Sequence, residues 1–274
     1  MNNIYNYKII NKAYPQITIN DVNNHLKEEF EEINIYTENN YLANVYTLAL
    51  SYGTAILGYT NQERIVFVPS TTNTGNVEIN VLGLGNKKLF LSDGISQVPA
   101  SYLTPNTRYY CEYGNTLDGG VGAYKISTKT DDENLSEYVF DLINTAYFLA
   151  EKYTNKTFTI TTFEIEFFET NLSCFELRKC PFIELIEVYI NDAIYDLNEI
   201  DVDNTRYPFA ILDFNSCINI NSIKFKAGYE FLPYIVKNAI LNIVGYLYEN
   251  RGDCMNEVPN QIMCDLDKEK LYKI

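Results

Sequence analysis

A stretch near the C-terminal end, residues 233–251, constrains the fold more than any other part of the chain. Pro233 suits a first helical turn, where its missing N–H is not needed. Apolar residues then recur at spacings of four, three and four, as on one face of a helix: Val236, Ile240, Ile243 and Leu247. This pattern predicts a helix that buries one face in the core of an α+β domain.

Composition places the chain among globular proteins. At 274 residues it can form one large or two ordinary domains, and its 46% hydrophobic fraction is enough for a real core. The formal charge of -15 argues against a clamp for nucleic acid, which needs clustered Lys and Arg. An acidic pore through which DNA slides stays compatible with this charge, as does a generic acidic surface.

Cysteine usage and hydropathy predict a reduced, cytosolic setting. The N-terminus lacks a basic region followed by an apolar core, so no secretory signal is expected. No run reaches the roughly 20 apolar residues of a membrane span. The six cysteines form no C-x-x-C pair, so neither a zinc site nor a cofactor is expected: Cys111, Cys174, Cys180, Cys217, Cys254 and Cys264.

Two helices are expected before residue 62. The first covers residues 17–35, with Thr18 or Asn20 as its cap. The second covers about residues 40–57 and ends at a Gly58 stop signal. Its expected apolar stripe is Leu42, Val45, Ala49, Tyr52 and Ile56.

Residues 65–128 have a different texture. Short runs alternate apolar and polar residues and are broken by Gly, Pro, Asn and Asp, which predicts an all-β module. Asp93-Gly94 is a candidate hairpin turn. The many tyrosines between Tyr102 and Tyr124 could stack on sugar rings, although packing is their commoner role.

Residues 131–155 give the cleanest amphipathic helix, starting at an acidic run that suits a helix N-terminus. Strands are expected over residues 157–168, 175–178, 184–190 and 222–226. In the first of these, Phe163, Ile165 and Phe167 alternate with Glu164 and Glu166, which predicts a sheet with one face exposed to water.

No catalytic constellation is found, so the chain is not expected to be an enzyme. The only histidine, His25, lies on the first expected helix and favours a surface or core role over that of a base. Gly83-Leu84-Gly85 lacks the third glycine of a dinucleotide loop. The acidic runs are interpreted as solvated helix faces.

The order of several short motifs resembles the head–tail connector (adaptor) proteins of long-tailed phages. The resemblance covers roughly residues 131–251 and rests on a helix ending Glu151-x-Tyr153-Thr154-Asn155, a strand ending Ala227-Gly228-Tyr229, and a helix signature. The signature residues are Lys237, Ala239, Ile240, Tyr248, Glu249, Asn250 and Arg251. A similar Tyr-Thr-Asn ending follows the helix expected at 40–57, and either helix could be the family's first. The later one is favoured because strands follow it directly.

The resemblance implies an α+β fold: a helical connector domain with a small antiparallel sheet, plus an inserted sandwich- or barrel-like β module. The expected division is 1–62 for an N-terminal helical part, 63–128 for the inserted module, 129–251 for the connector core and 252–274 for a C-terminal arm. The arm is either a portal contact, as the family implies, or a terminal helix packed on its own domain. Its candidate portal contacts are Val258, Pro259, Ile262, Leu266, Leu271 and Tyr272.

The implied function is structural. A ring, of twelve subunits in the family, joins the portal to tail or neck proteins, and double-stranded DNA passes through without specific binding. The protein would belong to the virion neck, with assembly in the host cytoplasm and no membrane partner.

The inserted module suggests the alternative. Asn73-Thr74-Gly75, followed by Gly83-Leu84-Gly85 and Lys88, is similar to β modules of phage tail and fibre proteins. This resemblance implies a component that binds carbohydrate or a host surface. The module's place inside the chain, away from a free end, favours the structural role.

Overall fold

The computed structural model describes residues 5–30, 32–128, 131–168, 171–191, 193–205, 209–250 and 258–271. The chain separates into two compact units. Unit 1 contains residues 1–16 and 142–274, and unit 2 contains residues 17–141. Each unit is described by itself.

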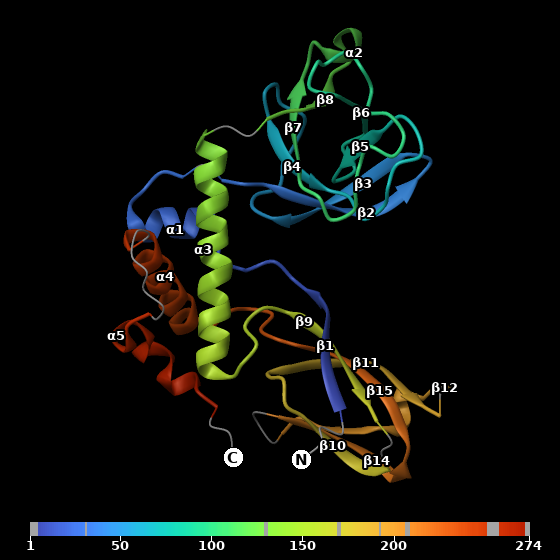
Figure 1. Ribbon diagram of the computed structural model, residues 1–274, viewed down its shortest axis with the longest axis vertical. Coiled ribbons are helices and arrows are strands. Elements are labelled where there is room, and N and C mark those ends of the chain that lie inside the picture. Colours follow the sequence, from blue (N-terminus) through green and yellow to red (C-terminus); the bar gives the residue numbers. More distant parts are fainter. Residues whose placement is uncertain are drawn as a thin grey trace. The chain divides into compact units, whose positions relative to one another are not determined.

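Unit 2 is built on a closed barrel of seven strands in the order β2-β3-β5-β6-β8-β7-β4 (Figure 1). The strands are β2 (Ile35–Leu42), β3 (Val45–Tyr52), β4 (Arg64–Val68), β5 (Glu78–Val81), β6 (Asn86–Phe90), β7 (Tyr109–Gly114) and β8 (Ala123–Ile126). Helix α1 (Ile19–Leu26) precedes the barrel, and the short α2 (Leu117–Gly120) lies between β7 and β8. Closure leaves the barrel without an edge strand.

The barrel core is rich in tyrosine. Tyr36, Tyr46 and Tyr124 are fully buried together with Phe67 and aliphatic residues. The hydroxyl of Tyr46 donates to the Thr71 carbonyl at 2.7 Å, so a large polar side chain is accommodated inside.

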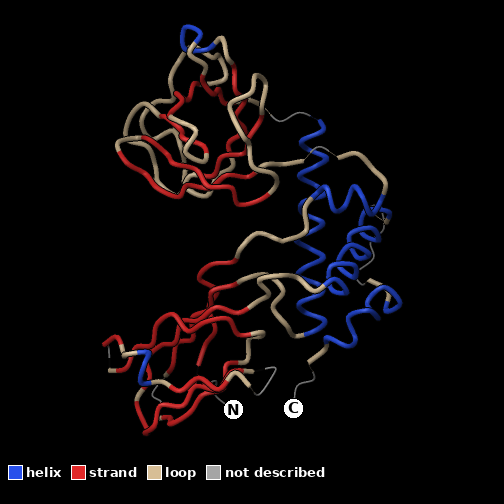
Figure 2. The backbone as a smooth tube through the Cα atoms, turned by 180° about the vertical axis from the view of Figure 1, so that it is seen from behind, coloured by secondary structure: helices blue, strands red, loops and turns tan. Residues whose placement is uncertain are grey.

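Unit 1 contains two sheets that enclose one core (Figure 2). The larger has the order β1-β9-β15-β11-β12 and the smaller β10-β14-β13. Their strands are β1 (Tyr5–Lys12), β9 (Thr161–Phe167), β10 (Leu172–Leu177), β11 (Phe182–Ile190), β12 (Ala193–Ile194), β13 (Asp201–Asp203), β14 (Ala210–Ile218) and β15 (Ile220–Ala227).

Helical elements complete unit 1. These are most of α3 (Asp131–Thr154), which starts in unit 2, together with η1 (Leu197–Glu199), α4 (Tyr234–Glu249), α5 (Asn260–Met263) and η2 (Cys264–Glu269). Both α5 and η2 contact α4. The helices expected at 131–155 and 233–251 are thus present as α3 and α4. In α4, the predicted stripe residues Val236, Ile240 and Ile243 are fully buried.

The expected helical connector domain with a small sheet is wrong, because the described chain is mainly β structure arranged in three sheets. Residues 40–57 show the error most clearly. They contain the end of β2 and the whole of β3, which form a hairpin in which Leu42 pairs with Val45 across the two-residue turn Ala43-Asn44. Both turn residues have positive φ, 52° and 64°, as the tight turns that match strand twist require.

The first helix is shorter than expected. Thr18 caps it as predicted, and Thr18 and Asp21 form a capping box. The helix ends at Leu26 because Lys27 adopts the left-handed conformation, and Asn23 then bonds both backbone groups of Phe30.

Candidate interaction surfaces

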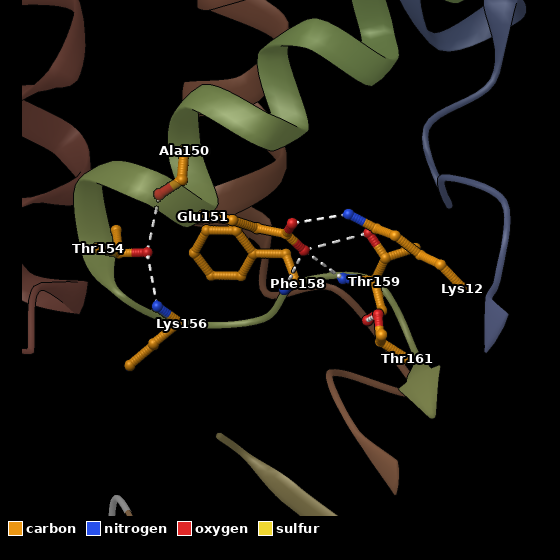
Figure 3. A network of polar contacts seen from close by, with 8 residues as sticks. All are labelled: Lys12, Ala150, Glu151, Thr154, Lys156, Phe158, Thr159 and Thr161. Atoms are coloured by element: carbon orange, nitrogen blue, oxygen red, sulfur yellow. Dashed lines mark hydrogen bonds and ion pairs between the residues drawn. The ribbon is translucent and has the colours of Figure 1, made fainter. Parts of the chain in front are cut away.

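The end of α3 carries a polar network that explains the Glu151-x-Tyr153-Thr154-Asn155 motif (Figure 3). One Glu151 oxygen accepts hydrogen bonds from the backbone N–H groups of Phe158 and Thr159, at 2.8 and 3.1 Å. The other oxygen pairs with the Lys12 ammonium at 2.7 Å. Glu151 therefore fixes the segment leading into β9 and ties it to β1.

Thr154 and Asn155 turn the chain at the same place. The Thr154 hydroxyl donates to the Ala150 carbonyl and accepts the Lys156 N–H. Asn155 has a φ of 58°, the left-handed conformation that Asn tolerates at a helix end. The motif is therefore a helix-ending device with a defined geometry.

The strand ending Ala227-Gly228-Tyr229 meets this network. Gly228 has a φ of 133°, and a Cβ there would lie 2.6 Å from the Thr159 carbonyl oxygen. The Tyr229 ring packs on Phe158, with 5.8 Å between ring centroids. Glycine is required at 228 both by its φ and by this backbone approach.

Gln16 joins the same region to the start of α4. Its side-chain amide donates to the Tyr229 carbonyl at 2.6 Å and accepts the Leu232 N–H at 2.8 Å. Its backbone N–H donates to the Tyr147 hydroxyl on α3. Gln16 thus joins α3 to the segment that precedes α4, through its backbone N–H on one side and its side chain on the other.

The helix signature plays mixed structural roles. Ala239 and Ile240 are buried, Lys237 and Tyr248 are half-buried, and Glu249 is exposed. Asn250 ends α4, and its side-chain amide donates to the Tyr246 carbonyl. Arg251 lies outside the described residues.

The described C-terminal segment, residues 258–271, packs on unit 1. Lys156, whose side chain is only 4% exposed, pairs with Glu269 at 2.6 Å. The Leu271 N–H donates to the Thr154 carbonyl, and the Tyr153 hydroxyl donates to Asp267. These contacts hold η2 against the end of α3.

The proposed portal contacts differ in accessibility. Leu266 is fully buried and Pro259 is exposed, while Val258, Ile262 and Leu271 are half-buried. Tyr272 lies outside the described residues. The portal contact stays a prediction, and in this conformation the Leu266 side chain is already occupied by its own unit.

An apolar patch precedes and begins α4. Phe231, Tyr234 and Ile235 are 87%, 76% and 53% exposed. Large aromatic residues that are exposed together are common at protein interfaces. The sequence did not predict this patch, because the pattern around Pro233 indicates where the helix begins but not which of the neighbouring side chains are exposed.

The outer face of the larger sheet is polar, as the Glu164 and Glu166 alternation predicted. These residues face away from the core, whereas Phe163 and Ile165 are buried in it. Lys224 and Lys226 on β15 form ion pairs with Glu187 and Glu184 on β11. The pKa of Lys224 is raised, first by its hydrogen bond to Glu187. Sequence reasoning missed the lysines because the strand order was unknown.

In unit 2, the motif residue Asn73 is a structural hub. It is fully buried, and its side chain bonds the carbonyls of Gly75 and Pro99 and the N–H of Leu103. Lys88 pairs with Asp118 at 2.7 Å. Asp93 accepts the N–H groups of Ile95 and Ser96, so Asp93-Gly94 forms a turn. These contacts stabilise loops of the barrel.

A small polar pocket of about 270 Å³ lies in unit 2. The buried Ser136 hydroxyl, which has no hydrogen-bond partner among the described residues, lines it. At roughly 30 Å³ for each water, its volume would hold about nine ordered waters. The other lining residues are Glu32, Ile33, Asn34, Gln62, Glu63, Arg64, Ile65, Val66 and Tyr110.

Two further observations concern chemistry and membranes. His25 is exposed on α1. Within the described ranges, no group of three or more His, Cys, Asp or Glu side chains could hold a metal ion. No helix of the described part of the chain is long and apolar enough to cross a membrane.

No family model matches the chain, and no curated protein matches it. Among the solved structures that resemble it are three with a TM-score of 0.42 each. One, 15% identical, is described as the neck of an empty GTA particle computed with C6 symmetry, and covers 51% of this chain and 80% of its own. Another, 14% identical, is the neck of a native GTA particle computed with C12 symmetry, covering 52% and 86%.

The third is the virion of a native gene transfer agent (GTA) particle, 14% identical, covering 54% of this chain and 81% of its own. Likenesses at this distance establish neither a family nor a function for the chain.

Proposed function

We propose that the chain is a structural protein of a virion neck, a head–tail connector that forms a ring between the portal and the tail. The observation that carries the proposal is the convergence of the motif segments. The α3 ending lies far in sequence from the Ala227-Gly228-Tyr229 strand end and the start of α4 that follows it, and Gln16 bonds to both regions. If these motifs mark a connector fold, the segments that carry them are expected to lie next to one another in the structure, as they do here.

The proposed role needs no catalysis. A ring of acidic subunits would repel phosphate, so double-stranded DNA could pass without being held. Loops and exposed apolar side chains would supply the head-to-tail contacts that close a ring. The Phe231, Tyr234 and Ile235 patch supports such contacts, since it is left uncovered by its own unit.

The alternative, a binder of carbohydrate through the β module, is not favoured by the tyrosines. Tyr110, Tyr113 and Tyr124 are buried, and Tyr109 is half-buried. Among the tyrosines from 102 to 124, only Tyr102 is exposed, at 42%. A platform for sugar rings needs exposed aromatic faces, so these side chains serve the barrel core.

The test is assembly of the full chain with the portal protein of its particle, measured by size exclusion with light scattering and by negative-stain imaging. We expect the chain to join the portal stoichiometrically and to add a ring to it. Replacing Ile262 by Asp should weaken binding, whereas Leu57→Asp, at a barrel position 95% exposed, serves as the matched control. A chain that ignores the portal but binds glycans or cells through its barrel would overturn the proposal.

A further inference from the structure

The outer face of the larger sheet in unit 1 carries a row of alternating charges. Lys8 on β1 lies opposite Glu164 on β9, which lies opposite Lys224 on β15. Lys224 in turn lies opposite Glu187 on β11 and is bonded to it at 2.7 Å. The row therefore runs Lys–Glu–Lys–Glu across four strands.

The face as a whole is nearly balanced in charge. Its positive side chains are three lysines, and its negative side chains are four glutamates, so they sum to -1. The whole chain has a formal charge of -15, so this face repels another copy less than an average surface of the molecule. The residues are Lys8, Lys224 and Lys226 with Glu164, Glu166, Glu184 and Glu187.

The two margins of the face have opposite charge. The exposed Lys8 lies on β1, which is an edge strand, whereas Lys12 on the same strand points to the other face and pairs with Glu151. Glu184 and Glu187 lie on β11, whose far side is paired with β12 at Tyr189 and Ile190 and accepts the Tyr195 N–H at Val188, all beyond Glu187. In the described part of the chain, both margins are therefore open to another molecule.

We propose that Lys8, at the β1 margin, contacts the glutamate margin of β11, Glu184 and Glu187, of a second copy of this chain. Copies placed side by side in the same orientation bring opposite charges together, which is the heterologous contact that a ring requires. Bulges interrupt both strands, between Ile9 and Asn11 and along β11. Because bulges blunt backbone pairing, side chains make this contact. The inference rests on the proposed ring function and names its subunit interface.

The commoner role for such a face is a solvated surface with cross-strand ion pairs. A solvated face and a subunit interface differ in how charge reversal affects assembly. For a solvated face, Lys8→Glu and Glu187→Lys leave assembly unchanged. For an interface, each single reversal places like charges together, and the double variant restores opposite charges.

The first experiment compares these three variants in assembly with the portal, at low and high salt. We expect each single reversal to reduce ring formation at least tenfold at low salt, and the double variant to recover most of it. Thermal unfolding checks that each variant is folded. Matched controls are Lys152→Glu and Glu28→Lys, two exposed positions outside this face. Single reversals without effect, or a double variant that is not rescued, would overturn the inference.

A covalent test is independent of charge. Within one copy, Lys8 and Glu187 are separated by three strand spacings, roughly 14 Å, so a disulfide between them cannot form inside the subunit. We expect the double variant Lys8→Cys and Glu187→Cys to give a ladder of covalent multimers on oxidation of the assembled ring. The background replaces Cys174, Cys217, Cys254 and Cys264 by Ser.

The outcomes separate this inference from the proposed function. If the wild-type chain forms a ring on the portal but the cysteine variant gives only monomers, this interface is wrong and the connector role stands. If the wild-type chain neither joins the portal nor forms a ring, both proposals fail.

Discussion

The two units reach a stable core by different routes. The barrel of unit 2 is made from one continuous stretch, residues 35–126, and its strands close on themselves. Unit 1 assembles β1 from the N-terminal end with strands and helices that follow residue 142. The barrel therefore needs no help from distant segments, whereas unit 1 must hold its segments together.

Polar contacts reflect this difference. In unit 1, the side chains of Glu151, Lys156 and Gln16 bond to residues between 7 and 216 positions away. The barrel relies on apolar packing around tyrosines, with Asn73 securing its loops. We therefore expect single substitutions in the unit 1 network to disturb several elements at once, and substitutions at the barrel surface to have local effects.

The largest expected effect is that of Gly228→Ala. Its φ of 133° and a Cβ only 2.6 Å from a backbone oxygen predict a loss of about 4 kcal/mol in the free energy of unfolding. The matched barrel change is Gly83→Ala, with a φ of 80° and open space around the Cβ, which should cost about 1 kcal/mol. Denaturant unfolding followed by hydrogen exchange of each unit measures both. Equal losses would contradict the comparison.

Glu269→Ala should have the next largest effect. It removes the carboxylate from the buried Lys156 ammonium, and we expect a loss of about 2 kcal/mol, with faster hydrogen exchange over residues 260–271. The double variant with Lys156→Met removes the buried charge as well, so it should be more stable than Glu269→Ala alone. A double variant that is less stable would show that the pair is not coupled in this way.

Glu151→Gln tests the same difference between the two units with a smaller expected loss of stability. It keeps one acceptor for the Phe158 and Thr159 N–H groups but loses the charge that pairs with Lys12, so about 1 kcal/mol is expected. The barrel counterpart is Asp118→Asn, which breaks the partly exposed pair with Lys88 and should cost about 0.5 kcal/mol. Thermal unfolding of both variants tests the ranking.

Sequence patterns predicted those elements whose signals are local. The long apolar stripes of α3 and α4 were found, as was the alternation in β9. The hairpin of β2 and β3 was missed because Leu42, Val45 and Ala49 happen to fall at helical spacing, while the Ala43-Asn44 turn lacks the usual glycine. Period alone could not decide between helix and strand there.

The candidate interface could be predicted only in part. Glu164 and Glu166 were recognised as a wet face, but the Lys8–Glu164–Lys224–Glu187 row depends on strand order. Its members lie on four strands that are separated in sequence, so no local pattern connects them. The Phe231 patch was hidden for a different reason, since exposure at a helix start depends on what packs there.

The smallest expected effect concerns two buried cysteines, one in each unit, which report how readily each unit opens. Cys111 lies on β7, between β4 and β8 of the closed barrel, and Cys180 lies in the loop between β10 and β11. Burial raises the pKa of Cys111 to about 12 and that of Cys180 to about 11. At pH 8, alkylation should modify the exposed Cys174, Cys217 and Cys264 at once, then Cys180, and Cys111 last.

The Cys111 thiol makes the free energy of unfolding fall as the pH rises. The ordinary thiol pKa is 9.0, and burial in the barrel raises that of Cys111 to about 12. The unfolded thiol ionises first, so stability is full below pH 9 and falls as the pH rises towards 12. The variant Cys111→Ala removes this contribution and should show a flatter alkaline decline, measured by denaturant unfolding at pH 8 and 11. In the alkylation experiment, modification of Cys111 before Cys180 would show that the barrel opens more readily than unit 1, which is the reverse of the expected order.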